Sequence, residues 1–524
     1  MLKRFYFWLK EKSERAERSG FKGRLLFLAT GLAATAWFLV RVIPKPTRAT
    51  YPCMQAAAPL MSSFVVYLLG VFGGVSLWRQ LRSSWQRRRY AWAAACSVLL
   101  LACVGLVAVS HTDVSWAALN PFAGAPSQVL GPNSPVGQAR GIFPGRVVWS
   151  HAPGAATWEG TDGYWFDDRF NNQADCDWLI AQTLQELTGQ KTEKEAWQAI
   201  FSHYNRSHGL GEGGYRAGQK VAIKINQNNT YSHADSEEIN ASPQLVLSLL
   251  SSLVEQGGVG QEQITVSDPS RFITDYLYDK CHARFPGVRF VDNQGGDGRI
   301  KSEYVADAMH YSQDNGPLAR GICTVFTEAD YVINMALLKG HVGQGVTLCG
   351  KNWYGAMSIH NDWRKNHHNN FNQDRAGKPK YMTFVDFMGH KDLGGKTALW
   401  LIDGLYGSKN VGGKPAPKWS MEPFGGNWPC SLLGSLDPVA IDMVANDFLI
   451  TQFPTMADVN YSDMYLSEAA QADRAPSGVK YDPDGSGRGL ASLGVAEHWN
   501  NATDKQYSRN LGRQEGIELV YRKR

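Results

Sequence analysis

A chain of 524 residues is too long for one average domain, so several units, or a membrane part followed by a large domain, are expected. Its formal net charge of +5 is uneven: residues 1–111 carry 16 Lys and Arg against 3 Glu, a local net of +13, which leaves −8 for the remainder (+5 less +13). This mildly acidic remainder argues against nucleic-acid binding, which requires a basic face.

Three apolar runs lie near the N-terminus, at 25–43, 56–78 and 90–110. Each is about as long as the roughly 20 residues that a helix needs to cross a bilayer core. Basic residues precede the first run and fill the loop 79–89, so the positive-inside rule places everything after the third run outside. The sequence thus predicts a multi-pass protein of the cytoplasmic (inner) membrane with a large extracytoplasmic, periplasmic domain. A cleaved signal peptide is the alternative for the first run, although no clear A-x-A site follows it.

After a membrane anchor at 1–111, we expect a linker and helical lead-in at 112–215 and an α/β domain at 216–524. Residues 112–140 are rich in Pro, Gly, Ala and Ser, which is typical of a linker or an extended wrap. Apolar residues at helical spacing within 175–205 predict a pair of helices.

Strand-like and helix-like segments then alternate along the chain. A strand at 221–226, a helix at 242–256 and a strand at 264–268 predict a parallel, right-handed unit. The alternation continues with a helix at 273–285, a strand at 288–292, a central strand at 331–338, a strand at 397–403 and a helix at 437–449. We therefore predict an α/β fold with a mostly parallel, doubly wound sheet, preceded by three transmembrane helices.

Polar residues gather where the central strand ends. Lys339 and His341 close the strand, a glycine-broken loop leads to Thr347, and Lys351 and Asn352 follow. Such edges hold ligands in α/β domains, because the strands are rigid while the loop backbone is free to bind. For an isolated Lys-x-His, however, the polar end of a buried strand is the simpler interpretation.

Several short motifs, taken in order, resemble the family known as domain of unknown function 362. They are Val221-x-x-Lys224-x-Asn226, Ser242-Pro243, Ile264-Thr-Val-Ser-Asp268, Val332-Ile-Asn334, Lys339-x-His341, Thr347-x-x-x-Lys351-Asn352-x-x-Gly355 and Ser435-x-Asp437-Pro438. The resemblance implies a fold and a site. It implies no activity, because the family has no agreed one. The chain departs from the family at Ile225, Ala336 and Leu337, where one motif cation is missing, and it lacks the ferredoxin-like cysteines of some members.

The carboxyl ends of parallel strands meet at one edge of a sheet, so the motif residues are expected in one pocket there. The predicted catalytic residues are His341, Lys339, Lys351 and Asn352. The predicted ligand- or cofactor-binding residues are Lys224, Asn226, Asp268 and Thr347. A helix beginning near Val346 would place Thr347 and Lys351 on one face and offer its backbone amides to an anion, with His341 as the proton-transfer group.

Three aspartates end a strand or begin a helix: Asp268, Asp403 and Asp437. Helix capping is the simpler interpretation of Asp437, which precedes Pro-Val-Ala-Ile. For Asp268 and Asp403, capping and ligand binding both stay open.

A metal site is a second hypothesis, because His360, His367, His368 and His390 lie near Asp362. No H-E-x-x-H spacing occurs, and an exposed loop explains the composition equally well. The run 482–487 matches the first half of a calcium loop but carries Leu493 where a bidentate Glu is required, which favours a surface turn. The cofactor and the metal are unknown from sequence, and disulfide pairing stays open.

The sequence leaves two classes of function open. An enzyme acting on a small anionic or amide-bearing ligand is supported by Lys224, Lys339, Lys351 and His341. A non-catalytic, membrane-associated assembly or binding module is supported by the missing motif cation. We expect a small anionic ligand or a metal at a Lys/His/Asp site, the membrane as a partner, and no nucleic acid.

Overall fold

The structure, a computed structural model, describes residues 130–227, 230–313, 319–341, 345–358, 380–456 and 462–524, together with residues 35, 79, 80, 97 and 99. The chain divides into two units, Met1–Pro121 and Phe122–Arg524. The strands and helices named below all belong to the second unit.

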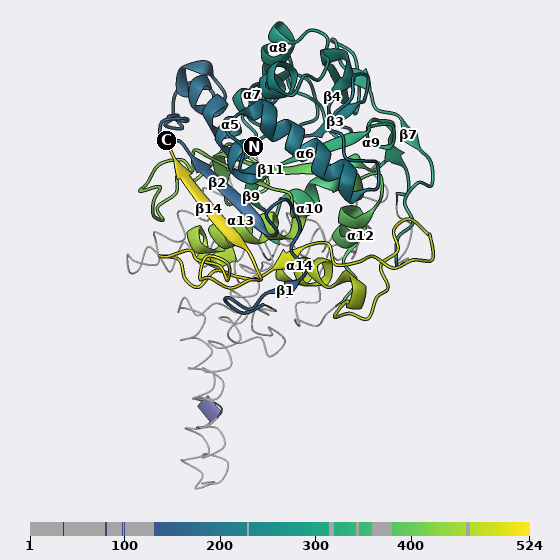
Figure 1. Cartoon of the computed structure of the whole chain (residues 1–524). Coiled ribbons are helices and arrows are strands. Elements are labelled where there is room, and N and C mark those ends of the chain that lie inside the picture. Colours follow the sequence, from purple (N-terminus) through teal and green to yellow (C-terminus); the bar gives the residue numbers. More distant parts are fainter. Residues whose placement is uncertain are drawn as a thin grey trace. The chain divides into compact units, whose positions relative to one another are not determined.

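One large sheet organises the described part of this unit, with strand order β14-β2-β12-β11-β9-β3-β4-β5-β6 and β10 paired to β9 (Figure 1). Its strands are β2 (Arg146–His151), β3 (Val221–Lys224), β4 (Ile264–Asp268), β5 (Arg289–Asp292), β6 (Ile300–Lys301), β9 (Tyr331–His341), β10 (Gly345–Val346), β11 (Thr397–Ser408), β12 (Ser431–Ser435) and β14 (Glu518–Lys523). All neighbours from β11 to β6 run parallel, whereas β12 is antiparallel to both β11 and β2. The sheet is therefore mixed but mostly parallel.

Two short strand pairs accompany the sheet: β1 (Val136–Gly137) with β13 (Val495–Ala496), and β7 (Tyr304–Val305) with β8 (Ile322–Cys323).

In the central strands, successive side chains enter opposite cores, because side chains alternate across a strand. Val221 and Ile223 of β3 pack into one apolar cluster, and Ala222 packs into the other. Burial on both faces explains why these strands are almost continuously apolar.

Helices lie on both faces of the sheet (Figure 1), and their side chains belong to the two apolar clusters. One cluster contains side chains of α5 (Gln173–Thr188), α6 (Glu193–Ser207), α7 (Pro243–Ser251) and α8 (Asp275–Arg284). The other contains side chains of α9 (Thr324–Thr327), α10 (Cys349–Asn352), α12 (Thr383–Gly389), α13 (Pro438–Gln452) and α14 (Ser462–Ala470). This is the layered arrangement that the βα alternation predicts.

The sequence places the main helix starts correctly, since local capping fixes them. The Asp437 side chain accepts hydrogen bonds from the backbone of Val439 and Ala440, and Pro438 occupies the first turn of α13. The Asn172 side chain caps α5, which ends at Gly189 with a φ of 69°. The helical pair predicted within 175–205 is confirmed as α5 and α6.

The central strand is longer than predicted. β9 continues to His341, and β10 folds back onto it with Gly345 opposite His341. Lys339 and His341 therefore lie within a strand that continues beyond its predicted end at residue 338. Strands β2, β12 and β14 were not predicted, and β2 and β14 join segments more than 360 residues apart.

The transmembrane part of the predicted fold is contradicted. Among the residues that the structure describes, no helix is long and apolar enough to cross a membrane. The longest described helix, α5, has 16 residues, or about 24 Å at about 1.5 Å per residue, against a bilayer core of about 30 Å. The runs 25–43, 56–78 and 90–110 lie outside the described residues, apart from Thr35, Ser97 and Leu99. We withdraw the three transmembrane helices and the multi-pass inner-membrane localisation that rested on them.

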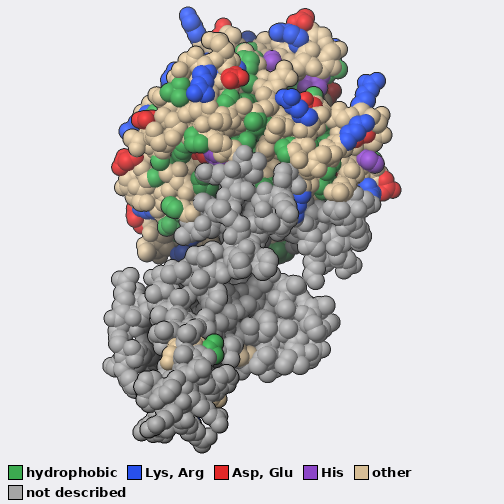
Figure 2. Space-filling view, turned by 90° about the horizontal axis from the view of Figure 1, so that it is seen from below, with side chains coloured by type: hydrophobic (Ala, Val, Ile, Leu, Met, Phe, Trp, Pro, Cys, Tyr) green, Lys and Arg blue, Asp and Glu red, His purple; other side chains and the backbone are tan. Residues whose placement is uncertain are grey.

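Figure 2 shows one face of the molecule, on which Lys and Arg side chains are interspersed with Asp and Glu side chains. Charges of one sign do not gather in a broad area among the coloured side chains of this view. A recessed site is therefore a better place than this face to look for recognition of a charged ligand.

Candidate functional site

Strands β3, β4 and β9 are neighbours in the sheet, and a cavity of about 200 Å³ opens where they end. The carboxyl edge of a parallel sheet is the usual ligand position in α/β proteins. The residues that line the cavity are Lys224, Asn226, Tyr231, Asp268, Ser270, Arg271, His341, Thr347, Lys351, Asn352, Tyr354, Gly355 and Val411.

The structure brings together seven of the eight residues that the sequence singled out: Lys224, Asn226, Asp268, His341, Thr347, Lys351 and Asn352. The eighth, Lys339, is fully buried and is not among the lining residues. Their assignment to catalysis or ligand binding stays a prediction.

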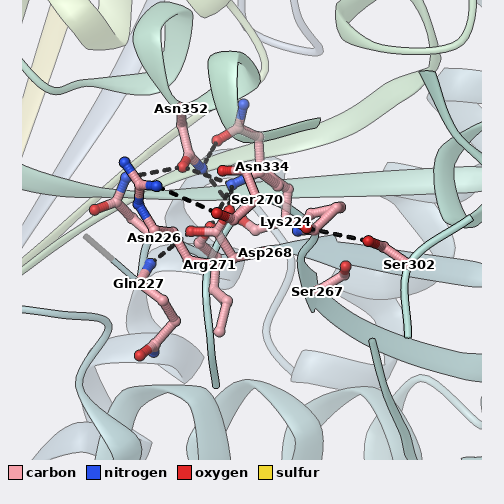
Figure 3. A network of polar contacts seen from close by, with 12 residues as sticks. Lys224, Asn226, Gln227, Ser267, Asp268, Ser270, Arg271, Ser302, Asn334 and Asn352 are labelled. Carbon is pink, nitrogen blue, oxygen red and sulfur yellow. Dashed lines mark hydrogen bonds and ion pairs between the residues drawn. The ribbon is translucent and has the colours of Figure 1, made fainter. Parts of the chain in front are cut away.

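Lys224 is the polar centre of the cavity wall (Figure 3). Its buried Nζ donates to Asp268 Oδ1 at 3.1 Å, to Asn352 Oδ1 at 3.1 Å and to the backbone oxygen of Ile225 at 2.6 Å. Burial lowers the pKa of Lys224, and the Asp268 carboxylate opposes that shift. Three acceptors match the three N–H groups of an ammonium, so Lys224 is held as a cation by protein groups.

Two asparagines extend this network to the central strand. Because Lys224 only donates, the Asn352 side chain must turn its oxygen toward Lys224 and its nitrogen toward Asn334, to which it donates at 2.8 Å. Asn226 donates to the same Asn352 oxygen at 3.2 Å. Residues from β3, β9 and α10 are therefore fixed relative to one another by hydrogen bonds of defined direction.

Gly355 lies against the ion pair. A Cβ at this position would lie 2.5 Å from Asp268 Oδ1 and 3.0 Å from Lys224 Nζ. Real Cβ atoms do not approach other atoms so closely, so a side chain here would displace the pair. The glycine of the Lys-Asn-x-x-Gly motif is thus required by a close approach.

The helix that carries Lys351 and Asn352 begins at Cys349, not near Val346, and has four residues. Its first amides are occupied: Asp442 accepts from the backbone nitrogens of Cys349 at 2.9 Å and Gly350 at 2.8 Å. The predicted anion site at a helix start is therefore wrong, because a carboxylate of α13 already satisfies those donors.

The cavity wall carries several basic side chains. Arg271, Lys351 and His341 line it, and Arg271 is the third residue after the end of β4. The Lys351 Nζ lies 4.9 Å from the centre of the Tyr354 ring, and the Arg271 guanidinium carbon lies 5.5 Å from the centre of the Tyr231 ring. Such contacts between a cation and a ring face orient both side chains.

Lys339 lies behind the wall, where its Nζ donates to the backbone oxygen of Ile239 at 3.4 Å. Burial lowers the pKa of Lys339 well below its ordinary value, and the charge of Lys351 lowers it further. Lys339 is therefore not one of the cations that line the cavity.

One of the three predicted aspartates is a helix cap. Asp437 caps α13 as described above, whereas Asp403 lies within β11 and accepts from the backbone nitrogens of Ser242 and Leu405 at 2.7 and 3.0 Å. Burial raises the pKa of both carboxyls to about 6. Asp268 is the aspartate that lines the cavity, and its role in ligand binding stays a prediction.

Among the residues that the structure describes, no group of three or more His, Cys, Asp or Glu side chains is placed to hold a metal ion. His360, Asp362, His367 and His368 lie outside the described residues. His390 uses both ring nitrogens, one with the oxygen of Ala308 and the other with the backbone nitrogen of Asp392. Asp482 accepts from the backbone nitrogens of Ser486 and Gly487 in an exposed turn.

Sequence reasoning missed Tyr231, Ser270, Arg271 and Tyr354. Ser270 and Arg271 had a usable signal, because they follow Asp268 at the end of a predicted strand. Tyr354 follows Lys351 by three residues, which places the two side chains on one helical face. Tyr231 and Val411 had no such signal, since only the tertiary fold brings their segments to this edge.

Residues 221–447 match the model of the family described as Domain of unknown function (DUF362). The chain thus resembles this family over a segment that contains every lining residue of the cavity. No curated protein and no solved structure matches the chain. The family description states no activity, so function has to be argued from the site.

Proposed function

We propose that the cavity of this chain, which resembles the DUF362 family over residues 221–447, binds a small oxyanion. The observation that supports the proposal is an excess of positive charge around one recessed cavity. Asp268 is the only carboxylate among the described lining residues, and its charge is balanced by Lys224 at 3.1 Å. The lining set also contains Arg271 and Lys351, so its side chains carry more positive than negative charge.

The buried surroundings make this excess effective. Lys351 is only 8% exposed, and charges interact more strongly in a low-dielectric site than in water. Burial lowers the pKa of Lys339 behind this wall, and the charge of Lys351 lowers it further. An anion in the cavity would accept charge-assisted hydrogen bonds from Arg271 and Lys351.

The size of the cavity limits the ligand. Pockets for drug-sized ligands measure about 300–1,000 Å³, whereas this cavity measures about 200 Å³. A phosphate or a small carboxylate group fits such a volume. A metal ion is less favoured at this position, because Arg271 and Lys351 would repel it and the lining residues supply only Asp268 and His341 as ordinary ligands.

His341 lies in the wall and is the candidate proton-transfer group if the bound anion reacts. A binding module without turnover is the second candidate function. It is favoured by Lys224, whose three N–H groups all bind protein atoms and so serve the architecture rather than a ligand.

Calorimetric titration of the full chain with phosphate, sulfate and malonate at low ionic strength tests the proposal. We expect binding that weakens with salt, and a loss of roughly tenfold or more in affinity for each of Arg271→Ala and Lys351→Met, since a charge-assisted hydrogen bond contributes about 1.5–3 kcal/mol. Lys220→Met is the matched control, because Lys220 pairs with Glu328 on the exposed surface.

Absence of heat and of thermal stabilisation with all three anions would overturn the proposal. Equal losses in Lys220→Met and Lys351→Met would also contradict it, because the effect would then reflect overall charge. Product analysis after incubation with small phosphate and carboxylate esters separates the two candidates: conversion lost in His341→Gln supports an enzyme, and binding without conversion supports a module.

A further inference from the structure

We infer that the ligand is an organic oxyanion, whose charged group enters the cavity and whose flat or apolar group stacks on Tyr231. The inference rests on the proposed anion site and narrows its ligand class. Tyr231 lies in the wall of the cavity, next to the cation that would hold the charged group.

Tyr231 is unusually exposed for an aromatic residue. At 63% it has the largest exposed fraction among the exposed large hydrophobic side chains of the described residues. Exposed aromatic surface contributes favourable free energy when a ligand covers it, in proportion to the apolar area removed from water. A ligand that covers the Tyr231 ring would therefore gain binding free energy from the apolar area removed from water.

The Arg271 contact gives the ring a defined place. The guanidinium carbon lies over the ring, 5.5 Å from its centre, so Arg271 contacts one face of Tyr231. Because the side chain is still 63% exposed, the remainder of the ring is accessible to solvent. One residue pair thus presents a cation and an aromatic surface side by side.

A second apolar group lies in the same wall. Val411 contributes to the lining and follows β11, a strand adjacent to β9 in the sheet. A bare inorganic anion has no apolar group that would pack against Tyr231 or Val411. An oxyanion joined to a planar organic group uses the cations and the apolar surface together, while the cavity of about 200 Å³ holds only its charged end.

Methyl phosphate and phenyl phosphate form a matched probe pair, since they carry the same charged group and differ in the flat substituent. For the full chain, calorimetric titration is expected to show phenyl phosphate binding roughly 3- to 10-fold more tightly, the range that an aromatic pair contributes. Tyr231→Ala is expected to abolish this preference, so that the variant binds phenyl phosphate and methyl phosphate with equal affinity. Tyr231→Phe is expected to retain the preference.

Tyr164→Ala serves as the control, because Tyr164 is 43% exposed and is not among the lining residues. Equal affinity of the native chain for both probes would overturn the inference and leave the anion site standing. A phenyl preference that survives Tyr231→Ala would also overturn it. Failure of both probes to bind, with phosphate, sulfate and malonate also failing, would instead remove the proposed function itself.

Discussion

The ammonium of Lys224 lies 3.1 Å from the carboxylate of Asp268, with side-chain exposures of 0% and 3%. The two residues end neighbouring parallel strands, β3 and β4, so the ion pair joins the strands at the edge where the cavity opens. A buried charge is tolerated only with a partner, and each member here is the other's partner.

Removing one member of this pair is expected to destabilise the fold strongly. Lys224→Met leaves Asp268 buried without its cation, and such changes cost about 3–5 kcal/mol in free energy of unfolding. Denaturant unfolding of the native and variant chains measures the loss. Lys220→Met breaks the exposed Lys220–Glu328 pair on the same segment and is expected to cost no more than about 1 kcal/mol. Similar losses in both variants would refute the assigned role of the buried pair.

Gly355→Ala is expected to disturb the same pair by overpacking. Its Cβ would lie 2.5 Å from Asp268 Oδ1, and insertion of a methyl group into a filled site costs about 1–3 kcal/mol. Gly213→Ala is the matched control, since a Cβ there has no heavy atom within 4 Å. Thermal unfolding and phosphate titration are measured on both. A Gly355→Ala chain as stable as the Gly213→Ala chain would show that the wall is loosely packed.

Asp442→Ala is expected to loosen the helix that carries Lys351 and Asn352. The carboxylate accepts from two amides of α10 and from the Tyr465 hydroxyl at 2.9 Å, so its loss leaves buried donors unpaired at about 1–3 kcal/mol each. Tyr465→Phe removes one of these bonds and should cost about 0.5–1.5 kcal/mol. We expect weaker phosphate binding in Asp442→Ala alone. If Tyr465→Phe lowers affinity equally, the cap is not what positions Lys351.

The His498 side chain gives stability a defined pH dependence. Burial alone lowers its pKa, but Asp447 and Asp463, at 2.5 and 2.9 Å, outweigh burial and raise the pKa to about 11. Because the folded-state pKa is raised above the unfolded value of about 6.5, the stabilisation is complete below pH 6.5 and is lost as pH rises toward 11.

The stability difference between the native chain and His498→Gln is therefore expected to be largest near pH 6 and to shrink by about pH 9.5. Denaturant unfolding at several pH values between these limits measures it. His282→Gln, which alters a histidine stacked on Tyr278, is the control. A difference that is constant across this window would show that His498 is not a cation in the folded chain.

Local patterns in the sequence determine much of the core. The continuous apolar runs predict β3, β4, β5, β9 and β11, because strands buried on both faces lack polar residues. Polar residues at the ends of those strands then predict most of one cavity wall, since parallel strands end at one edge. These predictions need only periodicity and the direction of the chain.

Contacts between segments that are far apart in the sequence determine the remainder of the fold and of the site. Strand β14 pairs with β2, so the chain end completes a sheet begun near residue 146, and no local pattern encodes that partner. Lys339 and Lys351 belong to successive motifs, yet only the fold buries the first fully and leaves the second in the cavity wall. Asp442 likewise accepts from the backbone amides at the helix start, where the sequence predicted an anion site. The sequence by itself determined which residues gather at this edge, whereas burial and partner choice, which depend on every packed element, determined the charge and availability of each.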